Sequence, residues 1–444
     1  MTTLVCNGAS LTCNCYWMSQ VILMKENNIT KMIALGLLAG VAATASAQAQ
    51  EDGGNLLLRK LVEKGILTQK EADELQAEAR RESEEHYTMW QQAPDLPSWV
   101  QKLSMKGDFR LRFDGISGND DTASTEDAGR PRFRYRLRYG VTATLNDDWK
   151  VGFRLASGGQ DDAISTNQSF DDDGENDMLN IDQAYVAWTP NDAMTLTMGK
   201  MPNTFSFDKA IIDGDYTPEG VAFNYERDIA EDHAFGFGVA GWVIDEASGG
   251  DGGAKDTYAA VAQVTLDSTL SETMTSHLGF GTYAFINGDS AAETTKNAGN
   301  TSGANHSPLI FDAALTYKGA SVPVTLGGTY INNTSDSAND TGYLLGVKIN
   351  KAQEAGSWEL SYQYRKLEAD SVFDNWTDSD YGAYGVNGTA TDFNAGTNLK
   401  GHVIKAKYQV NSAMQGVAAY YIADAINTNT DTTNRLQLDL IWKF

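Results

Sequence analysis

The clearest pattern in the chain is an alternation of basic and apolar residues that begins at Arg130. The basic positions are Arg130, Arg132, Arg134, Arg136 and Arg138, and the interleaved apolar positions are Phe133, Tyr135, Leu137, Tyr139, Val141, Ala143 and Leu145. Because successive side chains of a strand point to opposite faces, this pattern predicts one long strand with a basic face and an apolar face. The alternation stops at 146–148 and resumes at 149–157, which predicts a hairpin.

The same period of two recurs to the end of the chain. It predicts sixteen strands, at 103–113, 131–145, 149–157, 180–189, 193–200, 219–226, 233–243, 257–267, 273–285, 309–319, 322–331, 341–350, 357–368, 398–410, 414–423 and 433–444. The connections after even-numbered strands are short, such as 146–148 and 411–413. Those after odd-numbered strands are long and polar, such as 201–218 and 369–397. All long loops therefore emerge on one side of the sheet.

These features predict a transmembrane barrel and not a soluble sandwich. A sandwich buries its apolar face against a second sheet, whereas a membrane barrel turns it toward lipid and turns polar residues toward a water-filled lumen. Closing the first strand on the last removes both sheet edges, which lipid would leave without hydrogen bonds. We predict an all-β fold, a closed antiparallel sixteen-stranded β-barrel over residues 99–444.

The first 98 residues predict export and a short helical segment. A basic stretch with Lys25 and Lys31, an apolar stretch over 32–43 and small residues at 45–47 are typical of a signal peptide, which we place at 1–47 with the true start at Met24. Residues 48–98 favour a periplasmic helical or coiled-coil segment, in which Thr68 and Glu71 form a capping box. Such a segment is either a solvated spacer or an element for oligomerisation or tethering to the envelope.

Composition excludes several other classes of protein. A formal charge of −25 argues against nucleic-acid binding, which needs a basic surface. All three cysteines lie in the first fifteen residues and the five histidines are dispersed, so we expect no metal site and no cofactor. An outer-membrane enzyme would need a Ser–His or Asp–His pair at the lipid rim, where His277 and His402 are candidates by position alone. We expect no enzymatic activity.

The sequence resembles bacterial outer-membrane porins, and more closely the "putative porin" family of Gram-negative bacteria. The resemblance spans roughly residues 50–444 and is carried, beside the signal peptide, by 57–68, 130–139, 199–203 with 217–220, and the terminal 442–444. It implies a homotrimeric, water-filled channel with one loop folded inward as a constriction, surrounded by outer-membrane lipid and lipopolysaccharide. It also implies that the terminal aromatic residues, Trp442 and Phe444, form the signal read by the barrel-assembly machinery.

The expected site is a constriction between a basic wall and an acidic loop. The basic wall consists of Arg110, Arg112, Arg132, Arg134, Arg136, Arg138, Lys150 and Arg154. The loop after the fifth strand contributes Asp208, Asp213 and Asp215, with Glu219 just beyond it. Opposed charges of this kind orient polar solutes and reject apolar ones. Alternatively, the arginines pair with carboxylates of their own wall, such as Asp108 and Asp182, and only make the barrel rigid.

The predicted function is passive diffusion of small hydrophilic solutes and ions across the outer membrane. The arginine ladder favours an anion- or phosphate-selective porin as an alternative, because guanidinium groups hold phosphate bidentately. The acidic loops and overall charge favour cations at the mouth, so we expect a general pore with a mixed-charge constriction. An adhesin or receptor barrel and a secreted soluble β protein are further alternatives.

Overall fold

The computed structural model describes residues 100–118, 129–246, 255–287, 297, 299–335, 338–386, 393–427 and 432–444. The predicted signal peptide and helical segment lie outside these residues. Sixteen long strands form the wall: β1 (Val100–Ser117), β2 (Gly129–Leu145), β3 (Trp149–Ala156), β5 (Asn180–Asn191), β6 (Met194–Lys200), β7 (Glu219–Ala230), β8 (His233–Asp245), β9 (Thr257–Ser271), β10 (Met274–Ile286), β11 (Pro308–Tyr317), β12 (Val324–Asn333), β13 (Thr341–Ile349), β14 (Trp358–Leu367), β17 (Leu399–Gln409), β18 (Met414–Ala425) and β19 (Thr433–Lys443).

Shorter elements lie in the long loops. These are β4 (Gln168–Ser169), β15 (Gly382–Tyr384), β16 (Phe393–Ala395) and two 3₁₀ turns, η1 (Asp172–Gly174) and η2 (Asp374–Trp376). The described residues contain no helix that is long and apolar enough to span a bilayer. All sixteen predicted strands are present, and they pair into the closed antiparallel barrel that was predicted.

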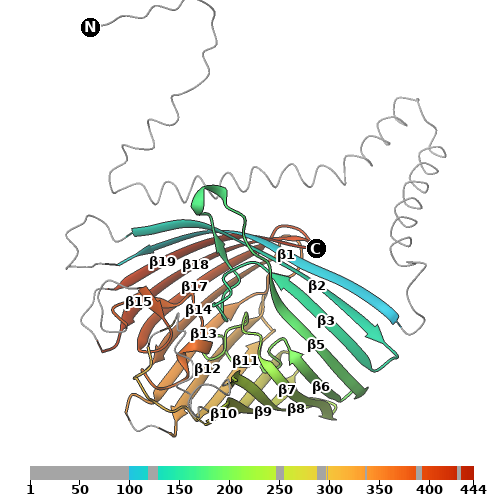
Figure 1. Cartoon of the computed structure of the whole chain (residues 1–444). Helices are drawn as coiled ribbons and strands as arrows, with labels where there is room; N and C mark the ends of the chain where they lie inside the picture. The colour runs from blue at the N-terminus through green and yellow to red at the C-terminus, as the bar shows by residue number, and fades with distance from the viewer. Residues whose placement is uncertain are drawn as a thin grey trace, which may run out of the picture. The chain divides into compact units, whose positions relative to one another are not determined.

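The sheet closes because β1 pairs with both β2 and β19 in antiparallel register (Figure 1). The seam continues to the last residue: Gly107 N donates to Phe444 O at 2.7 Å, and Phe444 N donates back to Gly107 O at 3.1 Å. A Cβ on Gly107 would lie 2.8 Å from the backbone carbonyl oxygen of Arg138, which is too close for a larger residue, so glycine fits where β1 meets the end of the chain. Over the described residues, closure leaves the barrel wall without an unpaired edge strand, as a barrel in lipid requires.

The outer surface is apolar and carries aromatic residues at both ends of the strands. Exposed side chains such as Phe133, Val151 and Leu345 alternate with inward-facing ones. Trp149 and Trp188 stack with their centroids 5.9 Å apart beside the short turns, and Tyr258 and Tyr330 lie near the long-loop ends. Two aromatic belts around an apolar band are the outer surface of a barrel that lies in a bilayer.

The inner surface has two unlike halves. On β8, β10, β12 and β13 it presents large buried apolar side chains, including Trp242, Tyr283, Ile331 and Leu344. Residues of the 201–218 loop and of segment 369–376 cover these side chains and bury them in one apolar cluster. On β1, β2, β3 and β19 the inner surface is instead ionic. The 201–218 loop was expected to fold inward. The inward fold of segment 369–376 was not predicted from the sequence.

Candidate functional site in the barrel lumen

The 201–218 loop spans the lumen between two distant parts of the wall. At one end, Asp215 Oδ1 lies 2.8 Å from Arg138 Nη1 on β2, and Asp215 Oδ2 lies 3.5 Å from Arg136 Nη1. At the other end, Asp208 Oδ2 accepts a hydrogen bond of 2.9 Å from Gln363 Nε2 on β14. The loop therefore narrows the passage and brings carboxylates to the arginines of β2.

The arginines of the basic wall also contact carboxylates on the wall itself. Asp108 lies 2.8 Å from Arg136 and 2.7 Å from Arg138, and Arg132 lies 2.7 Å from Asp114. Arg154 is paired with Asp182. The sequence suggested two alternatives, pairing of the arginines with the loop or with carboxylates of their own wall. Both occur, because Arg136 and Arg138 each contact one carboxylate of the wall and one of the loop.

Three members of the expected wall are less tightly paired. Arg110 Nη1 lies 3.9 Å from Asp439 Oδ2, although Asp439 already accepts two hydrogen bonds from Arg112 at 2.7 and 2.8 Å. Arg134 Nη2 donates to the carbonyl oxygen of Asn167 at 3.2 Å. Lys150 is exposed on the same face as Arg154.

The structure does not bring Glu219 to the constriction, and its expected place was wrong. Glu219 begins β7, where it is registered with Lys200 on β6 and Val243 on β8. Val243 is 39% exposed on the outer face, and residues directly opposite in a sheet share a face. Glu219 therefore points outward, where its carboxylate lies 2.9 Å from the Lys200 ammonium.

Trp442 and Phe444 lie on the β1–β19 seam, with the Trp442 ring 6.0 Å from that of Phe109.

Segment 368–381, between β14 and β15, supplies two carboxylates that the sequence analysis missed. Asp378 is buried, with Oδ2 2.9 Å from Arg365 Nη1 and an ion pair to Lys209 of the 201–218 loop. Asp380 lies 3.0 Å from Arg112 and 3.3 Å from Arg435. These contacts link β1, β14, β19 and both inward-folded segments into one ionic cluster.

The charges in this cluster set the protonation of its loop carboxylates. Burial alone would raise the pKa of Asp378, but Lys209 and Arg365 outweigh it and hold that pKa well below its ordinary value. Asp380 behaves alike: Arg112 and Arg435 outweigh burial, and its pKa is well below the ordinary value. Both groups are therefore charged at neutral pH and neutralise part of the basic wall.

Asp213 has the opposite environment. Burial raises its pKa well above the ordinary value, and the nearby carboxylates of Asp378 and Asp215 add to the rise. Its backbone N–H donates to the carbonyl oxygen of Trp376 at 2.6 Å, which ties the 201–218 loop to segment 368–381. The Trp376 ring lies 5.4 Å from Trp242 and 5.0 Å from Tyr283. This apolar contact fixes both segments on the β8–β10 wall.

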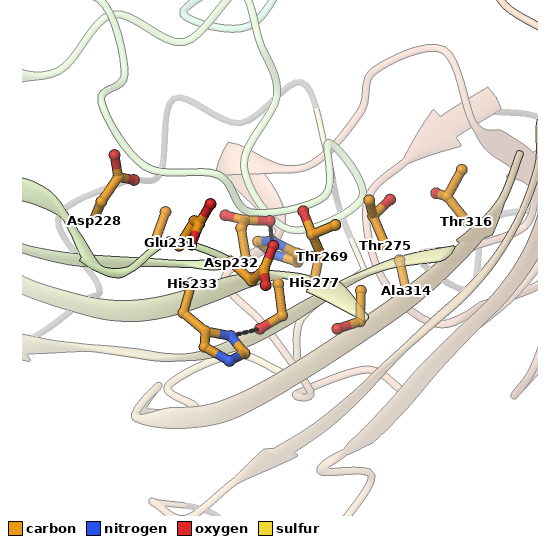
Figure 2. A pocket seen from close by; sticks show the side chains of 13 residues that line it. Asp228, Glu231, Asp232, His233, Thr269, Thr275, His277, Ala314 and Thr316 are labelled. Carbon is orange, nitrogen blue, oxygen red and sulfur yellow. Dashed lines mark hydrogen bonds and ion pairs between the residues drawn. The ribbon is translucent and has the colours of Figure 1, made fainter. Parts of the chain in front are cut away.

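A separate cavity of about 310 Å³ lies near the short turns and holds two histidines (Figure 2). His233 Nδ1 is 2.8 Å from Ser268 Oγ, while His277 lies between Asp267 at 2.8 Å and Asp312 at 3.0 Å. The Ser–His contact and the Asp–His contacts involve different histidines, so they do not make one Ser–His–Asp relay. The described residues contain no group of three or more His, Cys, Asp or Glu side chains placed to bind a metal ion.

Comparisons with known proteins agree with this architecture. The family model described as "putative porin" matches residues 117–322 and 307–444. Among solved structures, OprB of Pseudomonas putida is 10% identical over 77% of this chain and 94% of that chain, with a TM-score of 0.50. OmpF of Salmonella typhi, in complex with daunomycin, is 10% identical over 79% of this chain and 99% of that chain, with a TM-score of 0.47. A triple mutant of the Rhodopseudomonas blastica porin is 11% identical over 77% and 100%, with a TM-score of 0.42. No curated protein matches the sequence.

Proposed function

Because the chain belongs to the "putative porin" family, we propose that it forms a water-filled channel in the bacterial outer membrane through which small hydrophilic solutes and ions diffuse passively. The observation that carries this proposal is the contrast between the two faces of β2. Phe133, on the outer face, is 60% exposed to what would be lipid. The arginines of the inner face are held by carboxylates within the lumen. In a soluble β protein this apolar outer face would be exposed to water, which is unfavourable.

The solute path runs along the basic wall. The side chains of Arg132, Arg138 and Arg154 are 21%, 18% and 23% exposed, so water reaches them. The inner face of β8, β10, β12 and β13 is sealed by the apolar cluster and offers no path. A solute passing Arg138 also meets Asp215, and this pair forms a mixed-charge constriction that favours polar solutes of either sign.

Conductance separates this proposal from the adhesin or receptor alternative. Purified protein added to planar lipid bilayers is expected to give discrete current steps, and liposomes containing it are expected to swell in small sugars. A barrel that folds, as shown by heat-modifiable migration in a detergent gel, but carries no current would be an adhesin or receptor. We also propose that the protein is a homotrimer and, separately, that Trp442 and Phe444 form the signal read by the barrel-assembly machinery. Migration of unheated protein at the size of a monomer would contradict the trimer.

Replacing Asp215 with Asn is expected to shift the ion preference toward anions. The change removes the loop carboxylate that faces both Arg136 and Arg138, so the local positive charge at the constriction is less neutralised. Reversal potentials in a salt gradient measure the shift. Asp192→Asn, in an exposed short turn, removes the same charge outside the lumen and serves as the control. Equal reversal potentials for both variants would remove Asp215 from the constriction.

A further inference from the structure

Two lysines lie side by side on the outer surface of the barrel, at the long-loop ends of the neighbouring strands β14 and β17 (Figure 1). Lys366, next to last in β14, is in register with Lys400, the second residue of β17. Lys366 is also in register with Tyr343 on β13, two residues before Leu345, which is 57% exposed on the outer face. Alternate residues of a strand share a face, and so do register partners, so both lysines point outward.

The charge of this lysine pair is only partly balanced. Like charges directly opposite each other in a sheet, with Cβ atoms about 5 Å apart, are destabilising. The Glu368 carboxylate lies 2.7 Å from the Lys366 ammonium and offsets that charge. Asp424 is in register with Lys400, but among the described residues no carboxylate lies within ion-pair distance of the Lys400 ammonium. The pair can therefore still accept an anion.

The lysine pair is unusual for its position on the barrel. Over the described strands, the one other lysine or arginine that points outward at the long-loop ends is Lys200 on β6. Its ammonium lies 2.9 Å from the Glu219 carboxylate on the adjacent strand. Adjacent outward cations at this end of the barrel thus occur at Lys366 and Lys400 alone among the described strands.

The surface changes in character from the lysine pair toward the middle of the wall. Two residues further in, Tyr364 is in register with His402, and their rings lie 5.3 Å apart. Two residues beyond them, Tyr362 and Ile404 are in register and are each 39% exposed, and Leu360 follows at 41%. Charged, aromatic and apolar side chains therefore succeed one another along β14 and β17. The headgroup, the boundary region and the acyl chains of a lipid follow in the same order.

We propose that Lys366 and Lys400 bind a phosphate group of a lipopolysaccharide in the outer leaflet, whose acyl chains lie along the apolar side chains below. Ammonium groups donate charge-assisted hydrogen bonds to phosphate oxygens, and basic side chains at a membrane boundary attract anionic headgroups. One phosphate on both ammonium groups also removes the repulsion between them.

The apolar side chains below the lysine pair favour a lipid over a free phosphate ion, because they cover its acyl chains at the same time. The resemblance to porins implied lipopolysaccharide around the whole barrel, whereas this proposal gives it one binding place. The site lies outside the lumen and goes beyond the proposed channel function. It requires the barrel to lie in a membrane, but not to conduct.

Lipid binding to the purified barrel tests the site directly. Barrel in detergent is titrated with lipid A, with lipid A from which the phosphates have been removed, and with inorganic phosphate, and bound lipid is measured by native mass spectrometry. Lipid A is expected to bind about tenfold or more tightly than the dephosphorylated form, and excess inorganic phosphate is expected not to displace it. Equal binding of the two lipids would overturn the proposal. Complete displacement by inorganic phosphate would also overturn it, because the site would then hold a free ion.

Variants distinguish the site from general attraction to a charged surface. Lys366→Gln and Lys400→Gln are each expected to weaken lipid A binding about tenfold, and to leave binding of the dephosphorylated form unchanged. Lys200→Gln is the matched control, because it removes a positive charge from the outer face at the same end of the barrel but away from the site. If Lys200→Gln weakened binding as much as Lys400→Gln, the site would be refuted. Heat-modifiable migration confirms that each variant is folded.

Planar-bilayer recordings keep this proposal separate from the channel function. Both lysines lie on the outer face, so Lys366→Gln and Lys400→Gln are expected to leave single-channel conductance unchanged. A protein that binds lipid A through these lysines but carries no current would refute the channel and retain the site. A protein that conducts but binds both forms of lipid A alike would refute the site and retain the channel.

Discussion

Deleting residues 369–397 and joining β14 to β17 by a short Gly–Ser turn is expected to raise single-channel conductance several-fold. Leu367 at the end of β14 is in register with Leu399 at the start of β17, so a tight turn can connect the two strands without disturbing the barrel. The deletion removes Phe373 and Trp376 from the apolar cluster and Asp378 and Asp380 from the ionic one. Both changes widen the lumen.

The same deletion has a cost that helps to interpret the result. It uncovers the inner apolar side chains of β12 and β13, including Ile331 and Leu344, and exposure of each such side chain to water is unfavourable by about 1.5–3 kcal/mol. The midpoint of unfolding in urea therefore falls while the barrel still migrates as a folded species in an unheated gel. A folded variant with unchanged conductance would mean that segment 368–381 does not border the passage.

Replacing Asp378 with Asn is expected to lower the free energy of unfolding by about 3–5 kcal/mol, the range for removing one partner of a buried ion pair. Asp378 is 3% exposed and Arg365 is 2% exposed, so the variant leaves the Arg365 guanidinium buried without its carboxylate. Lys209 loses the same partner, and the link between the two inward-folded segments weakens. Urea unfolding in detergent, followed by the shift in gel migration, measures the loss.

The double variant Asp378→Asn, Arg365→Gln is the matched control, because it removes both charges and leaves two neutral groups. It should recover part of the stability, as replacing a whole buried pair costs less than breaking one. A double variant as unstable as the single one would show that packing, and not the unpaired charge, is responsible.

The acid dependence of this effect has a definite sign. The pKa of Asp378 is depressed in the folded protein, so its contribution to stability is complete above the ordinary aspartate pKa and is lost as pH falls through the depressed value. The difference between wild-type protein and Asp378→Asn is therefore constant near neutral pH and disappears only in strong acid. A difference that vanished near neutral pH would place the Asp378 carboxylate outside the ionic cluster.

The strands could be predicted from the sequence because each of their faces meets a different solvent. Arg136 and its neighbour Leu137 lie on opposite faces of the sheet, and this requirement appears in the sequence as a period of two. The same rule places Arg435 inward and Leu436 outward on the last strand. Strands that follow one another in the chain then pair with one another, so the pattern predicts the number of strands, their pairing register and the closure of the sheet.

The constriction could be predicted only in part, because it depends on where long loops fold. Nothing in the spacing of Asp378 and Asp380 tells that they turn inward; their partners Arg365 and Arg435 lie elsewhere in the chain. Phe373 and Trp376 were the available signal, since large aromatic residues are unusual in a solvated loop. Glu219 was misplaced because the loop ends at Pro218, and the first position of β7 points outward.

The division of the inner surface into an ionic and an apolar half bears on how the barrel enters a bilayer. Near their long-loop ends, β8 to β13 carry apolar side chains on both faces, such as Val243 and Trp242 on β8 or Leu345 and Leu344 on β13. Hydrocarbon would accept either face of this part of the sheet. We therefore expect the sense of curvature during insertion to be set by β1 to β3 and β19, because contact of their inner-face arginines with lipid is unfavourable.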